Sequence, residues 1–218
     1  MASLDPFLMI AALAALAVLP FAAMMVTSFT KMIVVLSLVR NALGLQQVPP
    51  GIVLNGLAMV LSFYVMYPVG VGAWHAGSTH LPASGDGLPL TQLVSAVDDA
   101  KEPIKGFLFK HSRPQERAFF RDSAEQVMGK EVASTLNERD FVVLIPAFLA
   151  SELTEAFEIG FLIFLPFLVI DLLVASTLLA MGMQMMAPTI VSLPFKLLLL
   201  VWLDGWARLM HALVLTYR

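Results

Sequence analysis

Residues 152–186 read ELTEAFEIGFLIFLPFLVIDLLVASTLLAMGMQMM, an apolar run that opens with acidic residues and closes with methionines. Glu152, Glu155 and Glu158 recur every three residues, a spacing that keeps them on one side of a helix. Only 12 uncharged residues separate Glu158 from Asp171, whereas a helix in lipid needs about 20 apolar residues. Acidic side chains in such helices usually face a bundle interior or a water-filled path. We therefore expect this helix to pack in an assembly that has an aqueous lumen.

The segment that follows contains four methionines that fall on no single side of a helix: Met181, Met183, Met185 and Met186. Gly182 lies among them and Pro188 follows, so the pattern predicts a loop or a helix break. Methionine side chains are flexible and adapt to irregular gaps. Two readings stay open: static core packing, or a soft hydrophobic plug if the loop is repeated around a ring of subunits.

The composition is that of a membrane protein. Apolar residues make up 59% of the 218 residues, charged residues 13%, and the mean hydropathy is +0.84, against about 25% charged residues in ordinary globular chains. The net charge of −3 gives nucleic-acid binding no electrostatic basis. The absence of cysteine excludes disulfides and thiolate metal sites. The four histidines lack metal-ligand spacing, so we expect neither a metal site nor a cofactor.

The charged residues gather in the middle of the chain. Residues 75–140 hold 8 of the 13 basic side chains and 10 of the 16 acidic ones. We therefore predict three parts: an N-terminal apolar helical hairpin at 1–74, a small polar helical domain on the extracytoplasmic, periplasmic side at 75–140, and a C-terminal apolar helical hairpin at 141–218 that carries the methionine-rich loop 181–186.

Two uncharged runs make up the N-terminal hairpin. Phe7–Thr30 has 24 residues, enough to cross a bilayer, and Pro20 inside it should kink or break the helix. The segment 41–51 predicts a loop in which Gly44 closes the preceding helix. The second run is Ile52–Trp74.

Patterns in the polar middle predict short capped helices. A linker at 77–89 leads to a helix that bends at Pro103. Ser112 is suited to cap a helix that starts near Pro114. Residues 135–138 read as a capping box that opens the acid-bearing helix.

The C-terminal segment Leu197–Tyr217 predicts one last helix. Asp204 and Arg208 lie four residues apart with the acid first, the favourable order for an ion pair. We expect such a pair to form within the helix or between subunits. A proton relay would be the alternative, but no second candidate lies in register.

Several strings, taken together and in order, resemble the FliP/YscR/SctR family, which includes HrcR-like and SpaP-like proteins. They are LPF at 19–21, TSFTK at 27–31, LGLQQVPP at 43–50, IPAF at 145–148, AFEIGF at 156–161, LPFLVID at 165–171, MGM at 181–183, LPFK at 193–196 and DGW at 204–206. The resemblance spans nearly the whole chain and thins over about 75–140. Members are the R-type core components of flagellar and virulence type III secretion export gates.

The resemblance implies an all-α, non-enzymatic, pore-forming subunit that passes unfolded proteins across the bacterial inner membrane. In that family several copies, taken to be five, assemble into a helical ring with the S- and T-type components and contact the U-type component. The assembled core is thought to lie at the periplasmic face of the membrane. Nothing basic precedes the first apolar run, which favours the virulence branch over the flagellar one.

The family's methionine gasket corresponds to Met181, Met183, Met185 and Met186 of this chain. Gln184 occupies a position where family members often carry another methionine. The acidic face of Glu152, Glu155 and Glu158 then lines the lumen or forms an interface between subunits.

Two other classes of function compete with this interpretation. Broken apolar helices and acids within them are also typical of small-solute or ion transporters, although the chain has no internal repeat. A membrane hydrolase would need a nucleophile and base, and no arrangement of serine and histidine suggests one.

Overall fold

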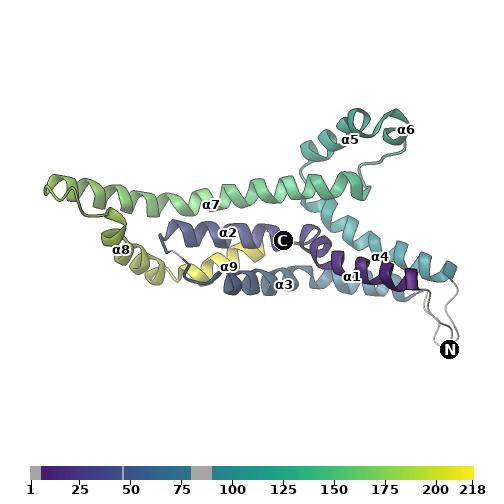
Figure 1. Cartoon of the computed structure of the whole chain (residues 1–218), viewed down its shortest axis with the longest axis horizontal. Helices are drawn as coiled ribbons and strands as arrows, with labels where there is room; N and C mark the ends of the chain where they lie inside the picture. The colour runs from purple at the N-terminus through teal and green to yellow at the C-terminus, as the bar shows by residue number, and fades with distance from the viewer. Residues whose placement is uncertain (1–5, 46, 80–89) are drawn as a thin grey trace. The chain divides into compact units, whose positions relative to one another are not determined.

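The computed structural model describes residues 6–45, 47–79 and 90–218, and every regular element in them is an α-helix (Figure 1). The all-α prediction is therefore confirmed. The helices are α1 (Pro6–Met25), α2 (Phe29–Ala42), α3 (Gly51–Ser78), α4 (Leu90–His111), α5 (Pro114–Met128), α6 (Lys130–Ala133), α7 (Phe141–Ala180), α8 (Pro188–Trp202) and α9 (Gly205–Leu215).

The chain divides into two compact units, and each unit consists of two stretches that are separate in the sequence. The first unit contains residues 1–30 and 69–150, and the second contains 31–68 and 151–218. Helices α3 and α7 each contribute to both units. The three-part division of the sequence stays a prediction, and most of the expected linker at 77–89 lies outside the described residues.

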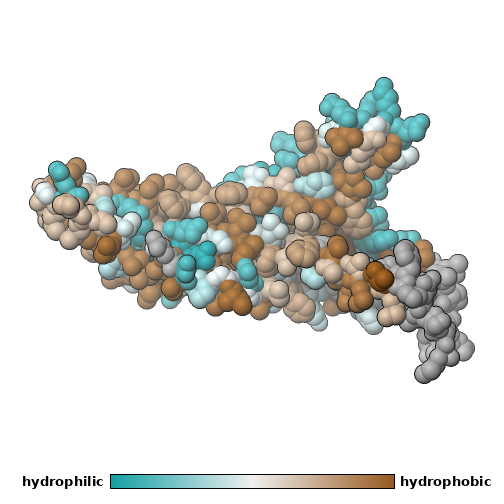
Figure 2. Space-filling view, viewed as in Figure 1, coloured by the Kyte–Doolittle hydropathy of each residue, from teal (hydrophilic) through white to brown (hydrophobic). Residues whose placement is uncertain are grey.

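The first unit holds the polar helices α4, α5 and α6. Phe107 of α4 packs on Phe148 of α7 with ring centroids 5.7 Å apart. The buried Arg117 of α5 donates hydrogen bonds to the carbonyl oxygens of Phe109 and Ser112, which close α4. Hydrophilic side chains gather over α5 and α6 (Figure 2). These contacts explain how a short polar segment gains a core of its own.

The expected start of a helix near Pro114 is confirmed, but the expected cap by Ser112 is not. Helix α4 continues through Pro103 to His111. The hydroxyl of Ser112 donates to the carbonyl of Phe109 at 3.3 Å, so it closes α4 instead of capping α5. Helix α5 starts on Pro114, whose missing N–H costs nothing at that position.

The predicted capping box at 135–138 is wrong by a few residues. The carboxylate of Asp140 accepts the backbone N–H of Asn137 at 2.7 Å, and its carbonyl accepts the N–H of Leu144 at 2.8 Å. Helix α7 therefore begins after Asp140. Glu138 is not available as a capping acid because it pairs with Arg121 at 2.5 Å.

The second unit packs α2 against the later part of α7. Four residues of α2 at helical spacing are buried: Met32, Val35, Leu36 and Val39. Gly160 of α7 permits the close approach, because a Cβ there would lie 3.2 Å from the Cβ of Leu38. The predicted loop after α2 is confirmed, with Gly44 at φ +73° as its closing glycine.

Helices α3 and α7 are long and apolar enough to cross a membrane. Helices α1 and α2 form one bent pair, and α8 and α9 form another. If each bent pair crosses the membrane once, the described residues contain up to four membrane spans. Helix α1 contains Pro20 and ends at Met25, so the chain breaks after the proline. Helix α7 has 40 residues and is about 60 Å long, about twice the hydrocarbon thickness of a bilayer.

Candidate functional site

The methionine-rich loop joins α7 to α8 as a defined turn. Gly182 has φ +75°, a left-handed backbone that favours glycine. Its N–H donates to the carbonyl of Leu179 at 3.0 Å, and that of Met183 donates to the carbonyl of Leu178 at 2.9 Å. This pair of hydrogen bonds is the Schellman motif that ends many helices. The predicted helix break is confirmed, and Pro188 opens α8 beyond it.

All four methionines of this loop are exposed. The exposed fraction is 103% for Met185, 61% for Met181, 43% for Met186 and 40% for Met183. Gln184 is exposed as well. Static burial in the core of a single chain is therefore excluded, and the thioethers are free to contact something outside this chain.

A buried charge cluster joins the start of α2 to α7. The ammonium of Lys31 lies 3.0 Å from Glu152 Oε1 and 2.7 Å from Glu155 Oε2. The side chains of Lys31 and Glu152 are 1% and 0% exposed. Burying either charge alone would cost several kcal/mol, so each one compensates the other.

Tyr217, beyond the end of α9, completes this cluster. Its hydroxyl donates a hydrogen bond to Glu152 Oε2, and its ring centroid lies 4.2 Å from the ammonium of Lys31. Burial raises the pKa of the Tyr217 hydroxyl, and the negative charge of Glu152 raises it further. The phenol therefore stays protonated and remains a donor to the carboxylate.

A second buried cluster joins α8 to α7 and α2. Lys196 Nζ lies 2.6 Å from Asp171 Oδ2 and donates to the carbonyl of Ala42 at 3.0 Å. The hydroxyl of Ser192 donates to Asp171 Oδ1 at 2.6 Å. Two turns of α8 are thus fixed to the helix that precedes the methionine loop, so this cluster defines the hairpin that carries the loop.

The three predicted glutamates do not share one environment. Glu152 is buried in the Lys31 cluster, Glu155 is partly exposed at its edge, and Glu158 is exposed. The spacing of the glutamates did not predict that Glu152 and Glu155 form ion pairs within the chain. Lumen or interface roles stay predictions, and the exposed Glu158 is the acid that suits them best.

The intrahelical ion pair between Asp204 and Arg208 needs correction. The expected single helix over 197–217 breaks at Leu203, and Asp204 adopts a left-handed backbone at φ +50° before α9 begins. The backbone N–H of Arg208 donates a hydrogen bond to the carbonyl of Asp204 at 3.0 Å. Within the described part of the chain, the side chains of Asp204 and Arg208 form no ion pair with each other. The axes of α8 and α9 differ by 61°.

The sequence reasoning missed three residues that organise this site: Lys31, Lys196 and Tyr217. A usable signal was present, because Lys31 and Lys196 are isolated cations in apolar surroundings, Asp171 is an isolated anion, and Glu152 opens the row of three acids in an otherwise apolar segment. Lone charges of opposite sign in apolar helices are expected to pair. The choice of partners depends on tertiary contacts, because Lys31 and Glu152 are 121 residues apart along the chain and Asp171 and Lys196 are 25 residues apart.

The fold and the site define a class: an all-α membrane protein with paired internal charges and an exposed methionine loop between two apolar helices. The chain belongs to the FliP family, whose model matches residues 12–213.

Three named relatives match more than nine-tenths of this chain. The hypersensitivity response secretion protein HrcR of Ralstonia nicotianae is 52% identical, over 94% of each chain. The Yop proteins translocation protein R of Yersinia pestis is 49% identical, over 98% of this chain and 97% of its own. The flagellar biosynthetic protein FliP of Pectobacterium carotovorum is 43% identical, over 94% of this chain and 76% of its own. The family resemblance expected from the sequence motifs is therefore confirmed.

Proposed function

We propose that this chain is a pore-forming subunit of a type III secretion export apparatus in the bacterial inner membrane. Several copies surround a conduit, and the loop 181–186 of each copy contributes to a gasket that closes around the passing polypeptide. The subunit acts without catalysis and needs no cofactor. The relatives named for secretion and translocation, which match nearly the full length of the chain, support this proposal.

The single observation that carries the gasket role is the exposure of all four loop methionines on a structured turn. Exposed thioethers on a disordered tail would have no fixed direction. Here the Schellman motif and the Lys196–Asp171 ion pair fix the ends of the hairpin, while the methionine side chains stay free. Flexible apolar side chains of this kind can contact many different sequences, as a general export path requires.

The exposed apolar surface supports assembly. Large hydrophobic side chains are more than half exposed along α7 and α8, as at Phe161, Leu172, Ile190 and Trp202. Exposed apolar side chains that follow one another along two helices need to be covered by lipid or by protein. We propose that neighbouring copies in a ring of five, together with the S-, T- and U-type components, cover much of this surface at the periplasmic face of the membrane.

Ion leakage tests the gasket directly. Replacing Met183, Met185 and Met186 together with alanine should raise the conductance of membranes that contain the assembled complex, because smaller side chains leave the path open. The matched control replaces three exposed methionines outside the loop, Met24, Met25 and Met59, with alanine. Equal conductance in the two triple variants, with both complexes assembled, would contradict the gasket role.

The mass of the particle purified in detergent distinguishes the export gate from the rival class, a small-solute or ion transporter. A transporter of this type should be purified in detergent as a monomer or dimer. The export-gate proposal requires a particle that contains several copies of the chain. A mass of one or two copies for the complex purified from its native membrane would support the rival.

A further inference from the structure

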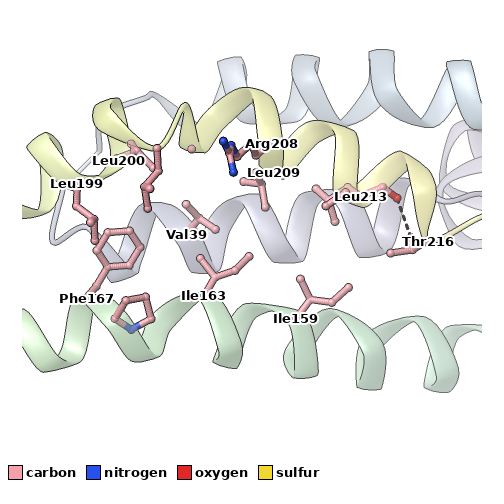
Figure 3. A pocket seen from close by; sticks show the side chains of 14 residues that line it. Val39, Ile159, Ile163, Phe167, Leu199, Leu200, Arg208, Leu209, Leu213 and Thr216 are labelled. Atoms are coloured by element: carbon pink, nitrogen blue, oxygen red, sulfur yellow. Dashed lines mark hydrogen bonds between the residues drawn. The ribbon is translucent and has the colours of Figure 1, made fainter.

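The second unit contains an apolar cavity that the proposed conduit does not use. Its volume is about 510 Å³, and residues of α2, α7, α8 and α9 line it (Figure 3). Its walls are aliphatic and aromatic, as at Val39, Ile163, Phe167 and Leu209. The volume falls within the range of about 300–1,000 Å³ typical of small-molecule sites.

One charged side chain, Arg208 of α9, stands in this apolar wall (Figure 3). It is exposed, and no carboxylate of the described chain lies within ion-pair distance of it. The lining also contains the hydroxyl of Thr216, which already donates to the carbonyl of Leu213 at 2.7 Å. The cavity therefore offers apolar walls with a single cation that lacks an anion.

The surroundings of Arg208 have the composition of a membrane interface. Trp202 ends α8 and Trp206 lies in the first turn of α9, and tryptophan is enriched where lipid head groups meet hydrocarbon. Helix α8 has 15 residues and is about 22 Å long, too short to cross the hydrocarbon core alone. The bend of 61° between α8 and α9 lies between Trp202 and Trp206, so the two tryptophans flank the break that leads to Arg208.

We infer that this cavity binds an anionic phospholipid, with an acyl chain between α7, α8 and α9 and the phosphate against the guanidinium of Arg208. An arginine presents several N–H donors in a fork that matches phosphate oxygens. An acyl chain buries its methylene groups against the apolar walls. A zwitterionic lipid could supply the same acyl chain, but its own cation would offset the phosphate charge. The site is therefore selective for anionic head groups.

Tryptophan fluorescence in lipid nanodiscs tests this inference, which does not depend on the proposed function. Trp74 is the one tryptophan of the sequence outside the α8–α9 region, so a Trp74→Phe background reports on Trp202 and Trp206. Brominated phosphatidylglycerol and brominated phosphatidylcholine are compared as quenchers at the same mole fraction. The site predicts stronger quenching by phosphatidylglycerol, and Arg208→Gln should lower this preference by about fivefold.

Three further variants sharpen the test. Arg208→Lys keeps the charge and should keep most of the preference, whereas Arg218→Gln removes one exposed charge outside the cavity and should leave it unchanged. Ala212→Phe fills the cavity while leaving Arg208 in position, and it should reduce quenching by both lipids. Equal quenching by the two lipids in the parent chain, or an equal effect of Arg208→Gln and Arg218→Gln, would overturn the inference. Loss of the oligomer in Arg208→Gln with unchanged lipid preference would also overturn it and would assign Arg208 to a subunit interface.

Discussion

At the scale of single residues, the second unit depends on two lysines that neutralise acids inside apolar helices. Lys31 pairs with Glu152 and Glu155, and Lys196 pairs with Asp171. Such pairs add little net stability compared with apolar packing, but removing one partner leaves an uncompensated buried charge. Their contribution to this protein is therefore the geometry that they impose: Lys31 fixes α2 to α7, and Lys196 fixes α8 to α7.

Lys31→Met should lower the free energy of unfolding by about 3–5 kcal/mol, because Glu152 would remain buried without its cation. Denaturant titration of the purified protein in detergent measures this loss. Lys101→Met serves as the control, since Lys101 pairs with Asp98 at the surface and its loss should change stability little. The double variant Lys31→Met/Glu152→Met should recover most of the stability. A double variant as unstable as Lys31→Met would contradict the charge argument.

At the scale of helices, the boundaries are decided by local hydrogen bonds and by close approach between neighbours. The Schellman motif at Gly182 ends α7, and the backbone of Asp204 separates α8 from α9. Gly160 lets Leu38 of α2 approach the backbone of α7. Gly182 lies in the methionine loop itself, whereas Asp204 and Gly160 lie in the helical segments outside it.

Gly160→Ala should destabilise the protein by about 1–3 kcal/mol, because the added methyl group must displace Leu38. Gly56→Ala is the matched control, since Gly56 also lies inside a helix but has open space around it. There alanine should be neutral or stabilising by up to about 1 kcal/mol. Thermal unfolding of the two variants in the same detergent compares them. Equal midpoints would show that α2 and α7 do not need this close contact.

Helix content and the loop positions could be predicted from the sequence, because apolar runs, glycine and proline act over a few residues. The methionine loop and the turn at Gly44 are examples. The break at Asp204 was missed, because the expected ion pair with Arg208 favoured a continuous helix, although Asp204-Gly205 is a dipeptide that commonly marks a turn. The partners of Lys31 and Lys196 could not be predicted from the sequence, because they depend on which helices become neighbours.

At the scale of the whole molecule, the described residues leave many large hydrophobic side chains exposed. Met185 and Trp202 extend outward from the α7–α8 hairpin, with exposed fractions of 103% and 79%. Lipid can cover part of such a surface, and sister copies can cover the rest. The proposed gasket therefore requires that the loops of several copies meet around one conduit.

Cysteine cross-linking at Met185 measures this convergence, and the absence of natural cysteine makes any introduced thiol unique. In the assembled complex, oxidation of the Met185→Cys variant should give covalent dimers of this chain in high yield. The control variant Val127→Cys, at a position of α5 that is 78% exposed, should give few. Dimers from Met185→Cys that are no more abundant than those from the control, in a complex that remains assembled, would contradict the central claim.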